Sequence, residues 1–438
     1  SYTQDGNLEG QRGIIRRSSV ASKIRKRMND DFAAGAITYL SRADGFANYE
    51  QAVAAPASLS MPEADKAVFV NNSNFVPEKD ANAVMPTTGA NNGMTALDLR
   101  GADYDDERWE TLLDNLTIDE MVNMIALGGY QTAPADSIGK VATTDCDGPA
   151  SINNNFTGVG SIGFPSAVMI ASTFNEDIAL SFGESIAKMA DEMNVSGWYA
   201  PAMNIHRSAF AGRNFEYYSE DAFLSGKIAA QAVSGAMSQG VYAYIKHFAL
   251  NDQETNRWEM LCTWSNEQAI REIYLKPFEI AVKEGGTTAV MSSYNYIGSQ
   301  WAGACNSLLN TVLREEWGFK GLVLTDYFAD FGYMDATRAI YNGGDACLIN
   351  RDVNTNYVTD TDDASTVLQM RRACKNILYT GINSRGMAEE NLETGPMIWQ
   401  VILVVVDIAV VALIIALEVM VVRKGYLKRK SIASKTEE

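Results

Sequence analysis

Charged and polar side chains gather in short clusters in the middle of this 438-residue chain, each directly after an apolar run. Burying charge without a partner is costly, so packing alone does not explain such clusters. Carboxylates accept hydrogen bonds from sugar hydroxyls, Lys, Arg and His donate to them, and Trp and Tyr offer faces for sugar rings. If the clusters converge, they form a pocket for a polyhydroxylated ligand. They read TTDCDGP (143–149), GRNFEYYSED (212–221), KHFALNDQETNR (246–257), MSSYN (291–295) and TDY (325–327).

Short apolar runs alternate with amphipathic helical stretches from about residue 105 to residue 385. Repeated strand–helix units indicate a parallel sheet, and this length is normal for a (β/α)8 TIM-like barrel. Active residues of such barrels lie where strands end and loops begin. The pattern therefore predicts an α/β fold with the polar clusters at its strand ends, but it leaves the number of strands open. The expected strands lie within 167–173, 195–204, 241–248, 287–295, 321–327 and 345–350.

Four of these segments together resemble glycoside hydrolase family 3. GRNFEYYSED is similar to the family's GR-x-x-E-x-x-x-ED segment, and KHFALNDQETNR is similar to its KHF…N…E…R segment. MSSYN resembles M-x-x-Y-N, and GLVLTDY resembles the strand-end motif V-x-(S/T)-D-(W/Y), which holds the nucleophile. All four occur in the family's order, within a resemblance that spans roughly residues 95 to 385. The resemblance implies the barrel half of a retaining β-glycosidase of the β-glucosidase-like branch.

The resemblance also assigns roles by position. Asp326 matches the nucleophile, which would attack the anomeric carbon and form a glycosyl–enzyme intermediate. Asp147 matches the carboxylate that grips sugar hydroxyls at the innermost subsite. The other matches either bind hydroxyls or lie beside the nucleophile: Arg213, Lys246, His247, Met291 and Tyr294.

Three further residues are expected to support this site. Glu216, together with Glu220, would brace Arg213 and its loop, and Arg257 would orient nearby carboxylates. For His206 the sequence leaves three roles open. It could contact a ligand, support the residues that contact one, or lie in the core with its hydrogen bonds satisfied. Three tryptophans are candidates for stacking at the rim, although a place in the core suits them equally well: Trp258, Trp264 and Trp301.

The second carboxylate of a retaining glycosidase is not apparent in these motifs. Such enzymes need two carboxylates about 5 Å apart, one that attacks and one that acts as acid and base. In the β-glucosidase-like branch of the family the acid/base lies on a separate α/β sandwich domain. The N-acetylglucosaminidase branch uses a loop histidine, but this sequence has KHFALN and no histidine after His247. We therefore expect the reversed domain order, with an upstream sandwich domain that carries the acid/base glutamate in a longer precursor.

Two classes of function remain open from the sequence. The first is an exo-acting β-glycosidase, with β-glucosides as the expected substrates. The sequence does not decide whether glucose, xylose or arabinose occupies the innermost subsite, so a β-xylosidase is an alternative. The second is a non-catalytic cell-surface glycan-binding protein on the same fold.

The composition of the chain limits the kinds of partner and cofactor that it is expected to bind. The formal net charge of −18 argues against a nucleic-acid partner. The five cysteines lack CxxC spacing and there are two histidines, so we expect no metal site, no disulfide framework and no cofactor.

A long apolar segment at 397–422 predicts a transmembrane helix. A bilayer core needs about 20 apolar residues, and basic residues mark the cytoplasmic flank. Arg423, Lys424, Lys428, Arg429 and Lys430 follow the segment. The sequence thus predicts a single-pass cell-membrane protein with the barrel outside and a cytoplasmic tail at 423–438. Asp407 lies within the span, where a charge is expensive, so we expect it to pair with a second transmembrane helix.

The remaining division of the chain follows from these assignments. Residues 1–100 are rich in Asn, Ala, Pro, Gly and Ser, which indicates a connector or the end of an upstream domain, with one helical stretch with a basic face expected at 18–32. Residues 101–385 form the expected barrel, and Thr117 is the expected cap of a helix near its start.

Overall fold

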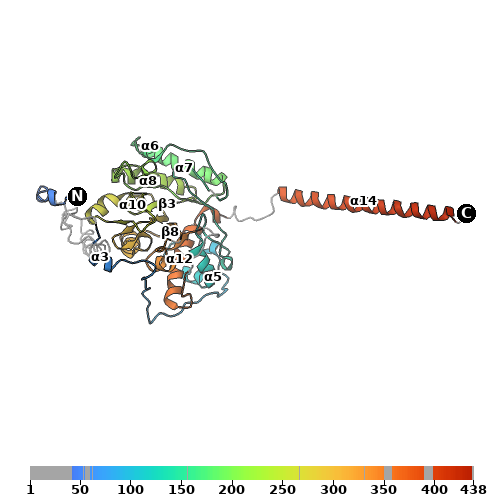
Figure 1. Cartoon of the computed structure of the whole chain (residues 1–438), viewed down its shortest axis with the longest axis horizontal. Coiled ribbons are helices and arrows are strands. Elements are labelled where there is room, and N and C mark those ends of the chain that lie inside the picture. The colour runs from blue at the N-terminus through green and yellow to red at the C-terminus, as the bar shows by residue number, and fades with distance from the viewer. Residues whose placement is uncertain are drawn as a thin grey trace. The chain divides into compact units, whose positions relative to one another are not determined.

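The computed structural model describes residues 42–52, 54, 60–61, 63–154, 156–265, 267–329, 331–349, 358–388 and 398–436 (Figure 1). The chain divides into two compact units, Ser1–Ala388 and Glu389–Glu438. This division falls close to the predicted end of the barrel at residue 385. The basic stretch at 18–32, predicted to be helical, lies outside the described residues, and the boundary at residue 100 stays a prediction.

The first unit is built on a parallel sheet, as predicted. Its strand order is β1-β2-β3-β5-β8-β9, and every neighbouring pair in it runs parallel. Nearly all residues of these strands are buried, which is typical of parallel sheets covered by helices. The strands are β1 (Asp145–Cys146), β2 (Gly197–Trp198), β3 (Tyr242–Phe248), β5 (Ala289–Ser292), β8 (Leu322–Tyr327) and β9 (Ala346–Leu348).

The turn at residues 128–130 bridges the two edge strands of this sheet. The Gly128 N–H donates to the Cys347 carbonyl of β9 (3.0 Å), and the Asp145 N–H of β1 donates to the Tyr130 carbonyl (2.8 Å). Residues 128–130 therefore link β9 to β1 and curl the sheet into a TIM-like barrel. The predicted α/β class is confirmed, and the described part of the chain supplies six strands to the sheet.

One expected strand is a helix in the structure. Residues 167–173 were predicted to contain a β-strand, but Ala167–Ala171 form helix α6 with Ser166 as its N-cap. A five-residue apolar run fits a buried strand and a buried helix equally well by periodicity, so this prediction was wrong for a physical reason. The predicted cap at Thr117 is confirmed, because its side chain accepts from the Glu120 N–H at the start of α5 (Ile118–Ala126).

Helices cover the outside of the sheet (Figure 1). Helices α7 (Glu176–Glu192) and α8 (Ala222–Met237) approach so closely that a Cβ at Gly183 would lie 2.1 Å from the Ala232 carbonyl oxygen. The other helices of the first unit are α2 (Tyr49–Ala52), α3 (Glu63–Ala67), η1 (Ala96–Leu99), α4 (Arg108–Leu113), η2 (Asp136–Ile138), η3 (Asn214–Glu216), α9 (Glu267–Ala269), η4 (Ile270–Tyr274), α10 (Lys276–Lys283), η5 (Ala302–Ala304), η6 (Ser307–Glu316), α11 (Ala336–Tyr341), α12 (Ala364–Ile382) and η8 (Arg385–Met387).

A second, three-stranded sheet lies beyond the strand ends of the barrel. It consists of β4 (Cys262–Thr263), β6 (Tyr296–Ile297) and β7 (Gln300–Trp301). The segment that precedes the barrel packs here, since the Tyr296 hydroxyl donates to the Val70 carbonyl (2.8 Å) and Phe69 stacks on the Tyr296 ring at 4.6 Å. Part of the predicted connector is therefore fixed to the barrel.

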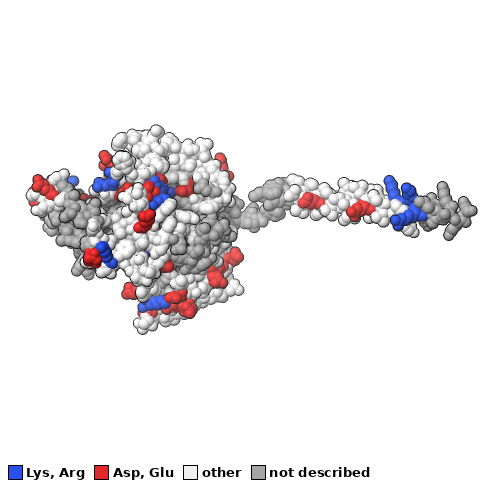
Figure 2. All heavy atoms as spheres, in the orientation of Figure 1, with Lys and Arg blue, Asp and Glu red and all other residues white. Residues whose placement is uncertain are grey.

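In the second unit the described residues form helix α14 (Ile398–Thr436). Within it, Ile402–Arg429 is long and apolar enough to cross a membrane, with a mean hydropathy of 2.9. Figure 2 shows this helix as mostly uncharged, with acidic positions along it and a basic group that follows them. The helix continues through most of the predicted tail, because Lys, Arg, Leu and Ala there favour helix and no proline ends it.

Candidate active site

The seven residues predicted to bind or attack a ligand come together around one cavity of about 200 Å3. They reach it from five strand ends and loops, as expected for the carboxyl ends of parallel strands. Lys246 and His247 belong to β3, Met291 to β5 and Asp326 to β8. The cavity is lined by Tyr130, Asp147, Tyr199, Arg213, Lys246, His247, Arg257, Met291, Tyr294, Asp326, Tyr327 and Leu348.

Asp326 lines this cavity with 8% of its surface exposed. Its Oδ1 accepts from the Tyr327 N–H (2.7 Å), whereas no hydrogen-bond partner for Oδ2 exists in the described part of the chain. The His247 Nε2 is 3.8 Å from that oxygen. Burial raises the pKa of Asp326, and the positive charges of Arg213, Arg257 and Lys246 partly oppose this shift.

Asp147 has a different environment, although it faces the same cavity. Its Oδ1 accepts from the Lys246 ammonium (2.8 Å) and from the Gly148 N–H (2.8 Å). Burial would raise the pKa of Asp147, but the charge and hydrogen bond of Lys246 outweigh it, so the net pKa is lowered. The turn after Asp147 requires glycine, since Gly148 has φ +103° and a Cβ there would lie 2.7 Å from the Ser151 Oγ. Asp147 is therefore an anion suited to accepting hydroxyl hydrogen bonds, not a proton donor.

Two arginines and two glutamates form a charged cluster beside Asp326. The Arg213 Nε donates to Glu216, as predicted, and its Nη1 lies 3.8 Å from the Glu254 Oε1. Arg257 pairs with the Glu254 Oε2 at 2.9 Å. Glu254 joins both arginines and was missed in the sequence, although its place three residues before Arg257 in QETNR was a usable signal. Glu220 does not join this cluster and lines a separate hollow.

His247 is held as a neutral imidazole. Its Nδ1 lies 3.3 Å from the Tyr217 hydroxyl, within hydrogen-bonding reach. Burial lowers the pKa of His247 well below its usual value, and the neighbouring charges of Arg213, Lys246 and Arg257 act in the same direction. A neutral ring of this kind both donates and accepts, so it suits a sugar hydroxyl.

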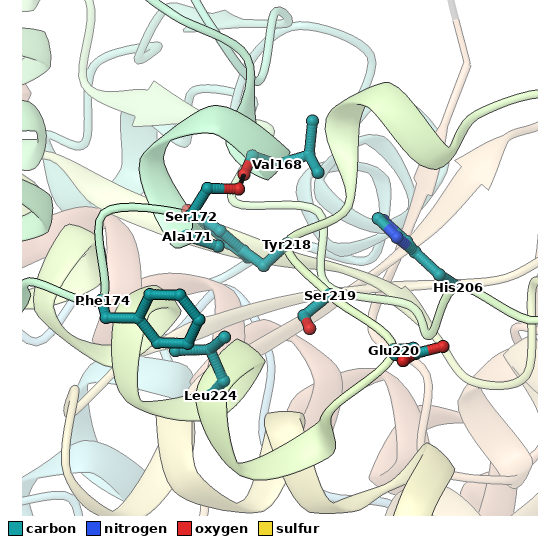
Figure 3. A pocket seen from close by; sticks show the side chains of 9 residues that line it. All are labelled: Val168, Ala171, Ser172, Phe174, His206, Tyr218, Ser219, Glu220 and Leu224. Carbon is teal, nitrogen blue, oxygen red and sulfur yellow. Dashed lines mark hydrogen bonds between the residues drawn. The ribbon is translucent and has the colours of Figure 1, made fainter.

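His206 does not reach this cavity. It lines a separate hollow on the surface, together with Phe174, Tyr218 and Glu220 (Figure 3). Its Nε2 makes a 2.8 Å hydrogen bond with the Tyr217 carbonyl, and the Tyr217 hydroxyl in turn lies beside His247. His206 therefore does not line the main cavity, and of the roles left open for it the hydrogen bond to Tyr217 favours support of the residues there.

Tyr130 and Tyr199 line the cavity although sequence reasoning did not select them. The Tyr199 hydroxyl accepts from the Tyr130 N–H (2.7 Å), which fixes the segment that links β9 to β1. Their only sequence signal was position, since Tyr130 follows Gly128-Gly129 and Tyr199 follows the expected strand at 195–204. Of the three tryptophans considered, Trp301 is buried in the core, while Trp258 and Trp264 are exposed.

Comparison with known proteins agrees with this arrangement. Residues 148–355 match the family described as "Glycosyl hydrolase family 3 N terminal domain". The barrel is therefore similar to the N-terminal domain of glycoside hydrolase family 3. The matched range contains every predicted site residue except Asp147, which directly precedes it.

Proteins similar to this chain include Beta-glucosidase A of Butyrivibrio fibrisolvens, 42% identical over 51% of this chain and 26% of the relative. Beta-glucosidase B of Emericella nidulans is 40% identical over 52% of this chain and 28% of the relative. The solved beta-glucosidase 3B from Thermotoga neapolitana in complex with alpha-D-glucose is 33% identical, with a TM-score of 0.58, over 66% of this chain and 45% of that one. The chain thus spans about a quarter of the length of these curated relatives.

Proposed function

We propose that this barrel supplies the nucleophile of a retaining exo-β-glycosidase that acts on terminal β-linked glucosides. The observation that carries the proposal is the Asp326 Oδ2, a buried carboxylate oxygen with no hydrogen-bond partner in the described residues, on a residue that lines a polar cavity. A carboxylate oxygen that accepts no hydrogen bond keeps its lone pairs available for attack. The relatives named as β-glucosidases, and the glucose bound in one of the similar structures, support glucose as the sugar.

The chemistry would proceed in two steps. One Asp326 oxygen forms a bond to the anomeric carbon as the bond from that carbon to the leaving oxygen breaks, and the leaving oxygen takes a proton. Water then attacks the anomeric carbon, releases the sugar and frees the carboxylate. Asp147, Lys246, His247 and Arg213 would hold the sugar hydroxyls during both steps. The cavity, at about 200 Å3, is smaller than the pockets of about 300–1,000 Å3 that hold drug-sized ligands, so it suits a single sugar ring and favours exo action.

The proton must come from an acid other than the carboxylates that line the cavity. Asp326 is the nucleophile in this proposal, and the lowered pKa of Asp147 makes it a poor donor. We therefore retain the proposal that a glutamate on an α/β sandwich domain, upstream in a longer protein, acts as acid and base.

The apolar helix α14 supports a membrane attachment for the same protein. In this proposal the barrel lies outside the cell membrane, α14 crosses it once and the basic end lies in the cytoplasm. Asp407 would pair with a second membrane helix, and loss of assembly in the Asp407→Leu variant, measured by crosslinking in detergent, would support that pairing. Unchanged assembly would argue against it.

Mechanism-based labelling tests the nucleophile. The full chain would be treated with a dinitrophenyl 2-deoxy-2-fluoro-β-glucoside, whose dinitrophenolate leaving group needs little protonation, and digested for peptide mass spectrometry. We expect the label on Asp326 and none in the Asp326→Asn variant. A label with a pentosyl donor alone would favour a β-xylosidase. A folded chain that binds glucose yet takes no label from either donor would contradict the proposal in favour of a non-catalytic glycan-binding protein.

A further inference from the structure

His247 is held at both its backbone and its ring. The Asn204 side chain holds the backbone, since its Oδ1 accepts from the His247 N–H (2.8 Å) and its Nδ2 donates to the His247 carbonyl (2.9 Å). The Tyr217 hydroxyl lies 3.3 Å from the ring Nδ1, and the two rings meet edge to face with centroids 6.2 Å apart. With Nδ1 turned to Tyr217, the Nε2 is the nitrogen that faces Asp326 in the cavity.

The hydrogen bonds around Tyr217 decide where its hydroxyl proton points. The Asn251 Nδ2 donates to the hydroxyl oxygen (3.1 Å). Burial raises the pKa of Tyr217 above its ordinary value, so the hydroxyl keeps its proton and acts as a donor. Two acceptors lie within reach of that proton, the His247 Nδ1 at 3.3 Å and the Asn251 carbonyl oxygen at 3.5 Å. The Nδ1 is the closer of the two, and it accepts a hydrogen bond only when it carries no proton of its own.

Asp326 favours the same protonation of His247 from the other side of the ring. The Asp326 Oδ2 lies 3.8 Å from the His247 Nε2 and accepts no hydrogen bond from any described residue. Burial lowers the pKa of His247, so the neutral ring has a single proton to place. On Nε2 that proton faces the carboxylate, which is electrostatically favourable, whereas on Nδ1 it would leave a lone pair facing the carboxylate. Two independent contacts therefore agree on Nε2.

We propose that Tyr217 is a positioning residue that donates to the His247 Nδ1 and so holds the ring as the Nε2–H tautomer, whose N–H donates to a hydroxyl of the bound sugar. The tautomer of a histidine is set by the hydrogen bond that its other nitrogen makes. A sugar hydroxyl that accepts from Nε2 keeps its own proton and can donate it to a carboxylate of the cavity. The hydrogen bonds then run in one direction from Asn251 to the sugar, and each strengthens the next. The contact with sugar rests on the proposed function, whereas the tautomer is a property of the free protein.

NMR of labelled histidine tests the tautomer directly, because the chain contains two histidines. Solid-state spectra of the full chain in lipid bilayers, with 13C,15N-histidine, separate protonated from unprotonated ring nitrogens, and correlation with the ring carbons tells Nδ1 from Nε2. The His206→Gln variant, whose amide can still donate to the Tyr217 carbonyl, identifies the His247 signals. We expect an unprotonated Nδ1 and a protonated Nε2 at His247. A protonated Nδ1 would overturn the proposal.

The Tyr217→Phe variant removes the hydroxyl and keeps the ring. We expect the protonated fraction of the His247 Nδ1 to rise. The rate at which dinitrophenyl 2-deoxy-2-fluoro-β-glucoside labels Asp326 should fall about tenfold, as for the loss of one hydrogen bond in the transition state. Tyr218→Phe is the matched control, because Tyr218 is the next residue, is 2% exposed against 1% for Tyr217, and makes no hydrogen bond to His247 among the described contacts. It should change neither the tautomer nor the rate.

A double variant separates an effect through His247 from a general loss of packing. In a His247→Ala background, Tyr217→Phe should lower the labelling rate no further, because Tyr217 then has no ring to hold. Rate losses that add, or a tautomer that is the same in Tyr217→Phe as in the unaltered chain, would remove Tyr217 from this role.

The two readouts also keep the inference apart from the proposed function. If Asp326 is labelled while the His247 Nδ1 is protonated, the proposed function stands and this inference alone fails. The expected tautomer without any label on Asp326 would reject the proposed function and the contact with sugar, and would leave Tyr217 as the residue that sets the tautomer.

Discussion

Two buried aspartates of the barrel, Asp145 and Asp326, are held in opposite ways. Asp145 of β1 accepts hydrogen bonds from the hydroxyls of Tyr242 and Tyr244, the second at 2.8 Å, and has no exposed surface. Asp326 of β8 has one oxygen bonded to a backbone N–H and the other without a hydrogen-bond partner in the described residues. Burial raises the pKa of both carboxyls, to about 6 for Asp145.

The difference lies in what opposes burial at each position. Tyrosine hydroxyls satisfy Asp145 directly and leave it no free oxygen for a ligand. Long-range charges from Arg213, Arg257 and Lys246 stabilise Asp326 as an anion without occupying its Oδ2. A buried group that lacks a hydrogen bond costs stability, and such a cost is often found where a protein does chemistry. Asp145 is therefore a carboxylate that stabilises the barrel, whereas Asp326 is one that is free to react.

The largest expected effect comes from replacing each aspartate by asparagine. Asp326→Asn should lower the rate of labelling by the 2-fluoro donor by at least about 1,000-fold, as expected for loss of a nucleophile. Asp145→Asn should leave that rate nearly unchanged in the folded fraction and lower the free energy of unfolding by about 1–3 kcal/mol. Labelling rates by mass spectrometry and urea unfolding would be measured on both variants.

The reverse pattern would break the comparison. If Asp326→Asn destabilised the chain more than Asp145→Asn did, the unsatisfied oxygen would have a structural role that the contacts do not reveal. We expect Asp326→Asn to be neutral or stabilising instead, because it removes a buried charge that lacks a hydrogen bond on one oxygen.

The second effect concerns the step that follows attack. If no lining carboxylate acts as base, the glucosyl–enzyme should persist, and azide, which needs no base, should speed its release by about 100-fold or more. The measurement is steady-state release of the phenol from a dinitrophenyl β-glucoside, with and without azide, and detection of β-glucosyl azide. Chloride at equal ionic strength is the control. A rate that does not respond to azide would place a working base within this cavity and contradict the sandwich-domain proposal.

The sequence predicted the charged residues that face the cavity better than it predicted the role of the fully buried Asp145. Asp147, Lys246, His247 and Asp326 were identifiable because charged residues directly after apolar runs need an explanation. Asp145 stands in the same TTDCDGP cluster, but its satisfaction by Tyr242 and Tyr244 depends on a strand about a hundred residues later. No local pattern carries such a pairing, so the structural carboxylate and the ligand-binding one looked alike in the sequence.

The same limit explains the other differences. The helix at Ala167–Ala171 and the placement of His206 depend on packing against distant segments, which periodicity does not report. Closure of the barrel by residues 128–130 depends on hydrogen bonds to β9, more than two hundred residues away. By contrast, the Thr117 cap and strand β8 follow from local rules, and both were predicted correctly.

A third, smaller effect tests the charges that stabilise Asp326. Arg213 is the first of the groups that oppose its raised pKa, so Arg213→Met should raise that pKa further. The carboxylate would then form at higher pH, and the acidic limb of the labelling rate should move upward by about one pH unit. Arg213→Lys keeps the positive charge and should keep the limb near its original place, although it loses the guanidinium geometry. Equal limbs in all three proteins would mean that Arg213 does not act on Asp326.

The smallest expected effect is on the free energy of unfolding, through the hydrogen bonds that Asp145 accepts. Tyr244→Phe removes the hydroxyl that donates to the Asp145 Oδ2 but keeps the ring that contacts Tyr199 at 5.0 Å. A hydrogen bond to a charged group contributes about 1.5–3 kcal/mol, so we expect the free energy of unfolding to fall by about that amount above pH 6.

The sign of the pH dependence sharpens this test. The folded pKa of Asp145 is about 6, above its usual 3.8, so the stability that its protonation contributes is present below about pH 4 and lost as the pH rises through 6. Loss of Tyr244 disfavours the anion, so the deficit of Tyr244→Phe should shrink as the pH falls from 7 to 4. Tyr333→Phe is the control, because the buried Tyr333 hydroxyl has no partner among the described residues and its removal should cost nothing. Urea unfolding across that pH range would measure both variants, and a deficit equal at pH 4 and pH 7 would show that the Tyr244 hydroxyl does not act by stabilising the Asp145 anion.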